Sequence, residues 1–265
     1  MKKKILALIC MVLITVPVLL TGCAKSDKLT VATNAEFEPF ETEKDGEIVG
    51  FDIDLINEIA KKLGMEVELK NMEFDGIVAA IQSKTYKVAI SGMTATPKRE
   101  KSVLFSIPYY TTTQVLITKK DDTIFTGTTK EEIDAQLVGK TIGVCSGFTG
   151  EAYVKGDEDM GLAGIADATT KVYDNISLAV TDLKNGNIDA IVMDKIVAKN
   201  AAEADVNKDA IVVKDITLTT ENYAIAINKN DTALKEKIDK ALQELIDSGK
   251  VEELYKKWEI DWEAK

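Results

Sequence analysis

Arg99 is the only arginine among the 33 lysine and arginine residues of the chain, which makes its side chain the first candidate for specific chemistry. The planar guanidinium of arginine can hold a carboxylate through two parallel hydrogen bonds, whereas lysine presents a mobile point charge. A single arginine in a chain that otherwise uses lysine therefore points to a ligand with a carboxylate. The alternative is a surface arginine in the charged segment 98–101, and Arg99 alone does not decide between the two.

The residues before Arg99 predict a helix start that could bind an anion. Thr96 is a good N-cap residue and Pro97 suits the first helical position, which places Arg99 in the first turn. Free backbone N–H groups at a helix N-terminus attract anions. The segment before them ends a predicted strand, where the ligand crevice of an open α/β sheet lies. The candidate contacts in this segment are Ser91, Gly92 and Thr94.

Two series of alternating strands and helices must position these residues. The first series has predicted strands at 29–32, 65–70 and 88–91 and helices at 52–63 and 74–83. The second has strands at 141–145, 170–172 and 190–193, a helix from about 150 and another at 176–185. Such alternation predicts mainly parallel sheets with helices on both faces. Residues 80–91 also resemble residues 182–193, which we interpret as two lobes of one plan, although any α/β chain can produce similar segments.

Two extended segments, 110–119 and 216–227, are rich in threonine and β-branched residues and predict a two-strand hinge between the lobes. The predicted organisation is a signal peptide at 1–22, a tether at 23–28, the first part of lobe 1 at 29–111 and lobe 2 at 112–216. Residues 217–265 then return to lobe 1 and add two C-terminal helices.

The first 22 residues have the features of a signal peptide. Three lysines at 2–4 precede an apolar run at 5–20, which is shorter than the roughly 20 residues of a transmembrane helix. The run ends in the sequence LTGC at 20–23, which resembles the bacterial lipobox. This resemblance implies cleavage before Cys23, acylation (palmitate) of that cysteine, and a protein anchored to the extracellular face of the cell membrane. The alternative is a secreted protein that is cut at another position.

Composition excludes several classes of function. The formal net charge is −11 and the lysines are dispersed, which argues against binding of nucleic acid or of an anionic membrane surface. Cys10 lies in the leader and Cys23 would be modified, so Cys145 has no partner for an intramolecular disulfide. The chain has no histidine to activate Cys145 as a nucleophile, and its sequence suggests no metal-ligand cluster and no cofactor.

Three segments carry a resemblance to a known family. Residues 50–60 (GFDIDLINEIA), residues 91–94 (SGMT) with Arg99, and residues 105–110 (FSIPYY) occur in the order and spacing of the extracellular solute-binding proteins of family 3. These are the polar amino-acid binders of ABC importers. The resemblance covers essentially the whole mature chain. It implies a two-lobed, type II periplasmic-binding-protein-like α/β fold, a free L-amino acid in the interlobe cleft, and delivery to an ABC permease in the membrane by a monomer.

The resemblance also implies roles for individual residues. Arg99 would pair with the ligand carboxylate, the segment 91–94 would add hydrogen bonds, and Asp194 at the end of the strand 190–193 would hold the ammonium. A helix N-cap is the structural alternative for Asp194. Phe37 and Phe74 would pack against the aliphatic part of the ligand, with core packing as the alternative. Where similar proteins have Ser-Gly-Thr, this chain has Phe148 and Thr149 after Gly147. Either Thr149 or the backbone N–H groups of this helix start supply the usual contact, or Phe148 covers the ligand.

Ligand selectivity is expected to depend on residues such as Asn34 and Glu36. An aspartate is frequent at the position of Asn34 in similar proteins that bind cationic ligands, so the amide favours a polar uncharged ligand such as glutamine, and Glu36 leaves a basic ligand as the second choice. One rival is an amino-acid sensor lipoprotein. Another is an enzyme on the same scaffold, which we do not expect because no pair of acids stands out as general acid and base.

Overall fold

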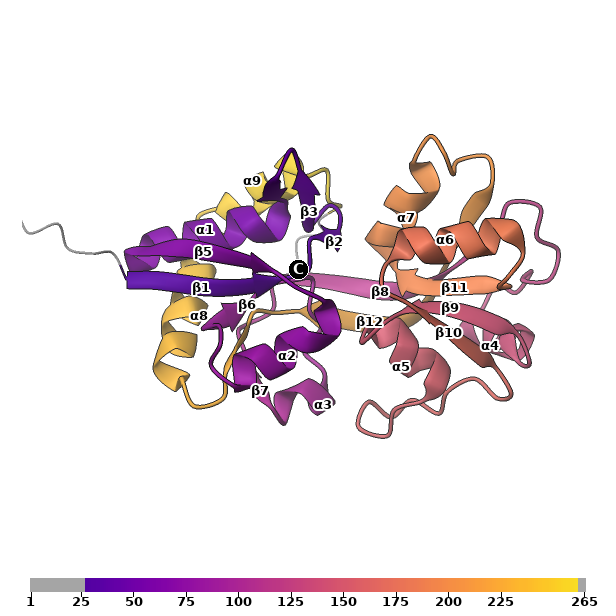
Figure 1. Cartoon of the computed structure of the whole chain (residues 1–265), viewed down its shortest axis with the longest axis horizontal. Helices are drawn as coiled ribbons and strands as arrows, with labels where there is room; N and C mark the ends of the chain where they lie inside the picture. Colours follow the sequence, from indigo (N-terminus) through magenta and orange to yellow (C-terminus); the bar gives the residue numbers. More distant parts are fainter. Residues whose placement is uncertain (1–26, 262–265) are drawn as a thin grey trace, which may run out of the picture.

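The computed structural model describes residues 27–261, and it forms two α/β lobes that are connected by two long strands (Figure 1). Lobe 1 contains a five-stranded sheet with the strand order β5-β1-β6-β13-β7. The strands β5, β1 and β6 are parallel, whereas β13 is antiparallel to both β6 and β7. The bounds are β1 (Asp27–Thr33), β5 (Met65–Asn71), β6 (Val88–Ala89), β7 (Val103–Phe105) and β13 (Ala226–Asn228).

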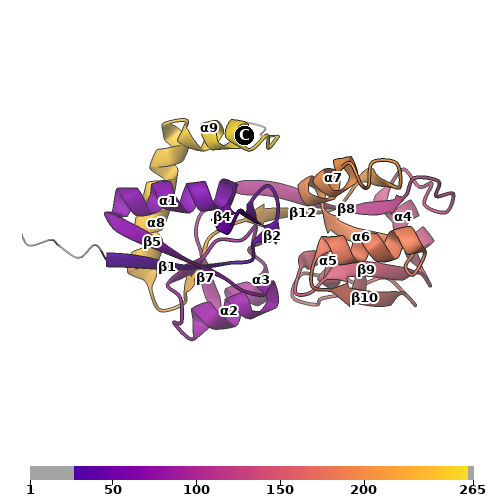
Figure 2. The same cartoon turned by 45° about the horizontal axis from the view of Figure 1, so that its top comes forward.

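Helices cover both faces of this sheet (Figure 2). The helices of lobe 1 are α1 (Phe51–Leu63), α2 (Phe74–Gln82), α3 (Pro97–Glu100), α8 (Thr232–Asp247) and α9 (Lys250–Lys257). On one face, Ile56 of α1 and Ile238 of α8 belong to the same buried cluster as Val31 of β1. On the other face, Ile77 of α2 packs in a cluster with Ala32. The alternation of side chains along β1 therefore serves both faces, as a strand buried between helix layers requires.

The helix α1 shows why the local sequence folds as predicted. Its buried residues, including Ile53, Ile56 and Ile59, recur at the spacing of one helical face. Gly64 ends the helix in the left-handed conformation, with φ of 67°, and its N–H bonds to the carbonyls of residues 60 and 61. A small antiparallel sheet precedes α1, and consists of β2 (Glu36–Phe37), β3 (Glu41–Lys44) and β4 (Glu47–Val49).

Lobe 2 contains the sheet β10-β9-β11-β8-β12, in which β10, β9 and β11 are parallel and β8 and β12 are antiparallel to their neighbours. The strand bounds are β8 (Tyr110–Lys119), β9 (Thr141–Cys145), β10 (Thr169–Tyr173), β11 (Ala190–Asp194) and β12 (Ile211–Tyr223). The helices are α4 (Lys130–Leu137), α5 (Thr149–Lys155), α6 (Ile176–Asn185) and α7 (Lys195–Glu203). Helices α6 and α7 lie on one face, and α5 on the other (Figure 1).

The strands β8 and β12 form the connection between the lobes. They pair antiparallel from Tyr110 opposite Tyr223 to Lys119 opposite Ile211, with a register shift between residues 214 and 219. Figures 1 and 2 both show this ladder running from lobe 1 into lobe 2. The first predicted crossing coincides with β8, and the second corresponds to the end of β12 with β13. This ladder therefore occupies the place of the predicted two-strand hinge.

The predicted leader and Cys23 lie outside the described residues. Of the predicted tether, Asp27 and Lys28 are described, and they belong to β1, where they align with Met65 and Glu66 of β5. These two residues are part of the lobe 1 sheet because the neighbouring strand extends far enough to pair with them. None of the helices in residues 27–261 combines the length and hydrophobicity that crossing a bilayer requires.

Candidate ligand-binding site

The sequence-predicted site residues lie where the carboxyl ends of the parallel strands of both lobes face each other. In lobe 1, Asn34 follows β1 and the segment 91–94 follows β6. In lobe 2, Cys145 ends β9 and Asp194 ends β11. Parallel strands that enter a sheet from the same side also leave it at the same edge, so each lobe gathers its loops there. The two loop clusters meet across the interlobe cleft.

Arg99 connects the two lobes. The Oγ1 atom of Thr96 accepts a hydrogen bond from the backbone N–H of Arg99 (3.2 Å), which confirms the predicted N-cap, although α3 has only four residues. The guanidinium donates through Nη1 to the carbonyl of Thr94 (2.7 Å) and through Nη2 to the carbonyl of Gly147 in lobe 2 (2.8 Å). Its Cζ atom lies 5.2 Å from the centre of the Phe74 ring. The side chain is therefore held in the cleft from both sides.

Two acids accompany the guanidinium. Burial lowers the pKa of Arg99 to about 10, while the carboxyl groups of Glu221 and Asp194 act in the opposite direction. Both acids are buried, with exposed fractions of 4% for Glu221 and 3% for Asp194. A buried ion is tolerated only with partners of opposite charge or with hydrogen bonds. The three residues together form a charged cluster at the base of the cleft that can receive the two ends of a zwitterion.

Asp194 faces the cleft and not the helix that it precedes. It occupies the N-cap position of α7, but its side chain makes no capping hydrogen bond there. Instead, its carboxyl group accepts a hydrogen bond from the Tyr223 hydroxyl. Burial and the neighbouring Glu221 together raise the pKa of Asp194 to about 7, against the hydrogen bonds from Tyr223 and Gln114. A cation in the cleft would oppose both causes.

Glu221 is a site residue that the sequence reasoning missed. Its Oε2 accepts hydrogen bonds from the hydroxyls of Thr94 in lobe 1 (2.8 Å) and Thr149 in lobe 2 (2.7 Å), and its Oε1 accepts one from Thr219 (2.7 Å). Gln114 of β8 donates to the hydroxyl of Thr149 (3.1 Å). A sequence signal for Glu221 existed, because Glu221 and Tyr223 alternate with Asn222 along the end of β12, where both are buried and Asn222 is exposed. An acid on the inward side of a predicted hinge strand is uncommon without a polar partner.

Aromatic rings line the cleft opposite the charges. The Phe148 ring at the start of α5 lies 5.4 Å from that of Phe37 and 4.5 Å from that of Phe74, measured between centroids. Phe148 thus contacts both aromatic residues that were predicted for lobe 1. The Thr149 hydroxyl, in contrast, donates to Glu221. Thr149 therefore belongs to the polar network, and Phe148 belongs to the aromatic group, while its role as a cover over the ligand stays a prediction.

The segment 91–92 is fixed by hydrogen bonds to other residues of lobe 1. The Ser91 hydroxyl donates to Glu41 (3.0 Å) and accepts from the backbone N–H of Asn34 (3.0 Å), while the N–H of Gly92 donates to Asp52 (2.7 Å). Gly92 has φ of 49°, and a Cβ atom there would lie 2.3 Å from the Phe37 ring, so only glycine fits. These polar groups fix the loop, and of the segment 91–94 it is Thr94 that contacts the charged cluster, through Glu221.

Further acids lie close enough to the end of β9 to act electrostatically on its last residue, Cys145. Burial, and after it the carboxyl groups of Asp194, Glu36 and Asp174, raise the pKa of the Cys145 thiol to about 12. Glu36 belongs to lobe 1, whereas Asp174 follows β10 in lobe 2. Within residues 27–261, no group of three or more acidic or cysteine side chains is arranged to hold a metal ion.

A cavity of about 520 Å³ opens beside the cluster, between α2 and α3 of lobe 1 and α5 of lobe 2. Arg99 lines it, together with Phe74 and Phe148, but Asp194 does not, so the cavity is one mouth of the cleft and not the whole predicted site. Ion pairs cross its rim, from Lys98 to Asp157 (3.5 Å) and from Lys101 to Asp159 (2.6 Å). Exposed pairs of this kind contribute little to stability.

Comparison with known proteins identifies relatives over nearly the whole chain. The model of a family described as bacterial extracellular solute-binding proteins, family 3, matches residues 29–260. The arginine-binding extracellular protein ArtP of Bacillus subtilis is 36% identical over 247 residues, which cover 90% of this chain and 92% of that protein.

Solved structures agree with this comparison. An ancestral arginine-binding protein is 40% identical and covers 87% of this chain and 97% of its own, with TM-scores of 0.76 for the complex with arginine and 0.75 for the complex with glutamine. An ancestral amino acid-binding protein described as a precursor of cyclohexadienyl dehydratase has a TM-score of 0.74 at 33% identity, and the match covers 87% of this chain and 94% of that one.

Proposed function

The chain belongs to family 3 of the bacterial extracellular solute-binding proteins, and from this premise we propose that its ligand is a cationic amino acid, with arginine preferred. The protein captures a free amino acid for an ABC transporter, as its relatives do. The observation that carries the proposal is the excess of acids in the cleft. Beyond the one acid that an ammonium group needs, Glu221 lies beside Arg99, and Glu36 and Asp174 act on the end of β9.

The proposed pose uses both groups of acids. The ligand carboxylate pairs with Arg99, the ammonium group pairs with Asp194, and the aliphatic stem lies among the rings of Phe37, Phe74 and Phe148. The side chain then extends toward Cys145, where the carboxyl groups of Glu36 and Asp174 favour a positive charge. Lobe 1 supplies the carboxylate contact and lobe 2 the ammonium contact, so the closed arrangement is favoured only when the ligand is bound to both.

A polar uncharged ligand is the second candidate. Asn34, which suggested it, donates its Nδ2 hydrogen to the carbonyl of Met72 (3.2 Å), so this amide already has a partner within lobe 1. An ancestral arginine-binding protein has also been solved with glutamine. Arginine and glutamine have the same α-amino and α-carboxyl groups. The acids near Cys145 should therefore determine which of the two ligands binds more tightly.

Calorimetric titration of the purified protein with arginine, lysine, histidine and glutamine tests the proposal. Arginine is expected to bind most tightly, because its guanidinium can donate hydrogen bonds to two carboxylates in a fixed geometry. Arginine should be recovered unchanged after prolonged incubation, since we propose binding without catalysis. Tighter binding of glutamine than of any cationic amino acid would overturn the proposal.

A variant in which the two acids near Cys145 are replaced by their amides tests the selectivity for a cationic side chain. Combined Glu36→Gln and Asp174→Asn substitutions are expected to weaken arginine binding about tenfold, because two partly exposed charge contacts of up to about 1 kcal/mol each are lost. Glutamine binding should stay within twofold of the parent value. The matched control is Asp209→Asn, which removes an exposed acid of lobe 2 that pairs with Lys120. An equal loss for arginine and glutamine would contradict the assigned selectivity.

We further propose that the protein is tethered to the extracellular face of the membrane through Cys23. This rests on the sequence pattern alone, and the binding site needs only one copy of the chain. In a Cys23→Ser variant expressed in the native host, the protein is expected to move from the membrane fraction to the soluble fraction, while arginine binding by the isolated protein is unchanged. Membrane retention of this variant would exclude the anchor.

A further inference from the structure

Two buried carboxyl groups, Glu41 of β3 and Asp52 of α1, lie directly behind the loop 91–92. Both side chains are fully buried, with an exposed fraction of 0%. Glu41 Oε1 accepts from the Ser91 hydroxyl (3.0 Å), and Asp52 Oδ2 accepts from the backbone N–H of Gly92 (2.7 Å) and from the Tyr109 hydroxyl (2.7 Å). Each carboxyl group therefore supports one residue of the loop.

The remaining oxygens of the pair are the unusual feature. Glu41 Oε2 and Asp52 Oδ1 are buried and accept no donor from the part of the chain that the structure describes. The two side chains also lie within hydrogen-bonding reach of each other. Two ionised carboxylates at this separation would repel each other strongly in a buried site, whereas a single proton between them would satisfy both orphan oxygens at once.

We propose that Glu41 and Asp52 share one proton and act as positioning residues that hold the ligand-binding loop 91–94 in its binding geometry. The effect on ligand affinity rests on the function proposed above. The shared proton itself does not, because it follows from the buried oxygens. Asp52 accepts two further donors and Glu41 only one, so Glu41 is the acid of the pair and Asp52 is the carboxylate.

The electrostatics of the surrounding elements agree with this assignment. Burial and the nearby Asp52 raise the pKa of Glu41 well above its usual value, whereas the pKa of Asp52 is raised only to about 6 because hydrogen bonds from Gly92 and Tyr109 oppose the effect of burial. The other titratable groups that face the pair are two tyrosines, Tyr109 before β8 and Tyr255 of α9, and both have a raised pKa. They are neutral at physiological pH and add no charge.

Loss of this proton as the pH rises should lower the stability of the fold. Because Glu41 binds its proton more tightly in the folded state, its contribution to stability is complete below its usual pKa of 4.5 and is lost as the pH rises toward the raised value. Within that window, the folding equilibrium constant changes by up to about tenfold per pH unit. The repulsion that follows at high pH acts on Ser91 and Gly92, so ligand affinity should fall with it.

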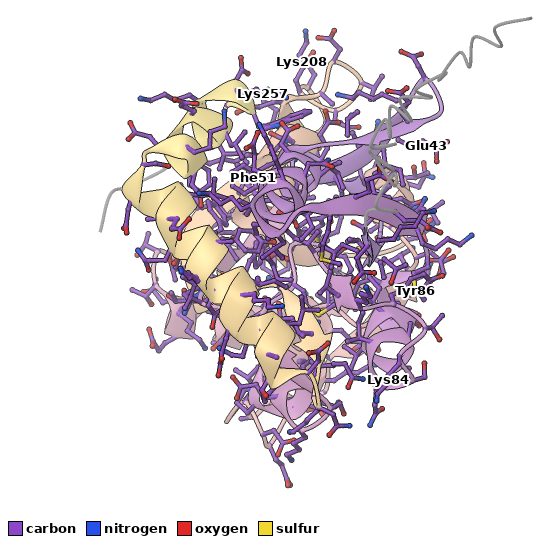
Figure 3. All side chains as sticks on the ribbon, turned by 90° about the vertical axis from the view of Figure 1, so that its left-hand side faces the viewer. Glu43, Phe51, Lys84, Tyr86, Lys208 and Lys257 are labelled. Carbon is purple, nitrogen blue, oxygen red and sulfur yellow. The ribbon has the colours of Figure 1, made fainter. Side chains whose placement is uncertain are left out.

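Glu41→Gln is the test variant, since the amide can accept from Ser91 and donate permanently to Asp52. Thermal melting without ligand from pH 5 to pH 9 is expected to show the parent losing stability relative to this variant as the pH rises. In the infrared difference between the parent and Glu41→Gln at pH 7, the parent should show an additional band of a protonated carboxylic acid, because Asp194 contributes equally to both proteins. The matched control is Glu43→Gln, because Glu43 is on the same strand but exposed, at the outside of the molecule in Figure 3.

Titration with arginine over the same pH range completes the test. The parent should lose affinity at alkaline pH more steeply than Glu41→Gln, and loss of the ligand's own ammonium proton is common to both proteins. Parallel melting curves and no difference in the infrared band would exclude a shared proton. A difference in melting with parallel binding curves would exclude the positioning role. If no amino acid binds the parent protein, the proposed function is wrong. The melting and infrared experiments still test whether Glu41 and Asp52 share a proton.

Discussion

Replacing Arg99 with alanine is expected to weaken amino-acid binding by about 2 to 5 kcal/mol, the cost of removing one partner of a buried, hydrogen-bonded charge pair. The loss has two parts. The ligand carboxylate would lose its bidentate partner, and Asp194 and Glu221 would remain buried without the cation that now acts on them electrostatically. The bridge from Nη2 to the carbonyl of Gly147 would also be lost, which weakens the contact between the lobes.

Isothermal titration with arginine and with glutamine measures this effect. Both ligands should lose affinity by the same factor, because Arg99 is assigned to the part of the ligand that they share. Arg99→Lys should retain a fraction of the affinity, since it keeps the charge without the planar fork. Lys98→Ala is the matched control, because Lys98 is the neighbouring cation and contacts only the rim at Asp157. Binding by Arg99→Ala at the parent affinity would remove the basis of the proposed pose.

Asp194→Asn is expected to have an effect of similar size, about 2 to 5 kcal/mol, for every amino acid that binds. The asparagine can keep the hydrogen bond from Tyr223, so the fold of β11 should be preserved while the charge that holds the ammonium is lost. Asp215→Asn, which removes an acid of lobe 2 that pairs with Lys195, serves as the control.

Asp194 also predicts a pH dependence that a purely structural residue would not produce. Its pKa of about 7 without ligand should fall when an ammonium group is bound, so binding releases a proton at or below that pH. The parent affinity should therefore be complete above pH 7 and fall about tenfold for each pH unit below it. The Asn variant should show no such slope in this range. An equal acid slope in both proteins would show that another group is responsible.

Glu221 shows why the two lobes are coupled at the hinge. Its carboxyl group joins Thr94 of lobe 1 to Thr149 of lobe 2, and it lies on the strand that connects them. A rotation of one lobe must separate at least one of these hydroxyls from Glu221. The hydrogen-bond network therefore links the ligand-binding cluster directly to the movement of the lobes.

Local sequence determined most of the secondary structure. The predicted bounds of β8, β9 and α6 coincide with those of the structure, because apolar periodicity and flanking turn residues act over short distances. The small sheet β2-β3-β4 and the helix α4 were not predicted. The β-sheet strands are two to four residues long, too short for a periodic pattern, and α4 has few buried positions.

The sequence by itself determined the identity of the cleft residues that carry unusual chemistry for their surroundings. Arg99 stands out because it is the only arginine, whereas the role of Asp194 came from the family resemblance, with which its position at the end of an apolar strand agrees. The tertiary structure decided which acids join them. Glu221 lies far along the chain from Glu41 and Asp52, and the sequence does not show which groups will surround each of these acids. Their role depends on burial and on the partners that folding brings within hydrogen-bonding distance, which are properties of the whole fold.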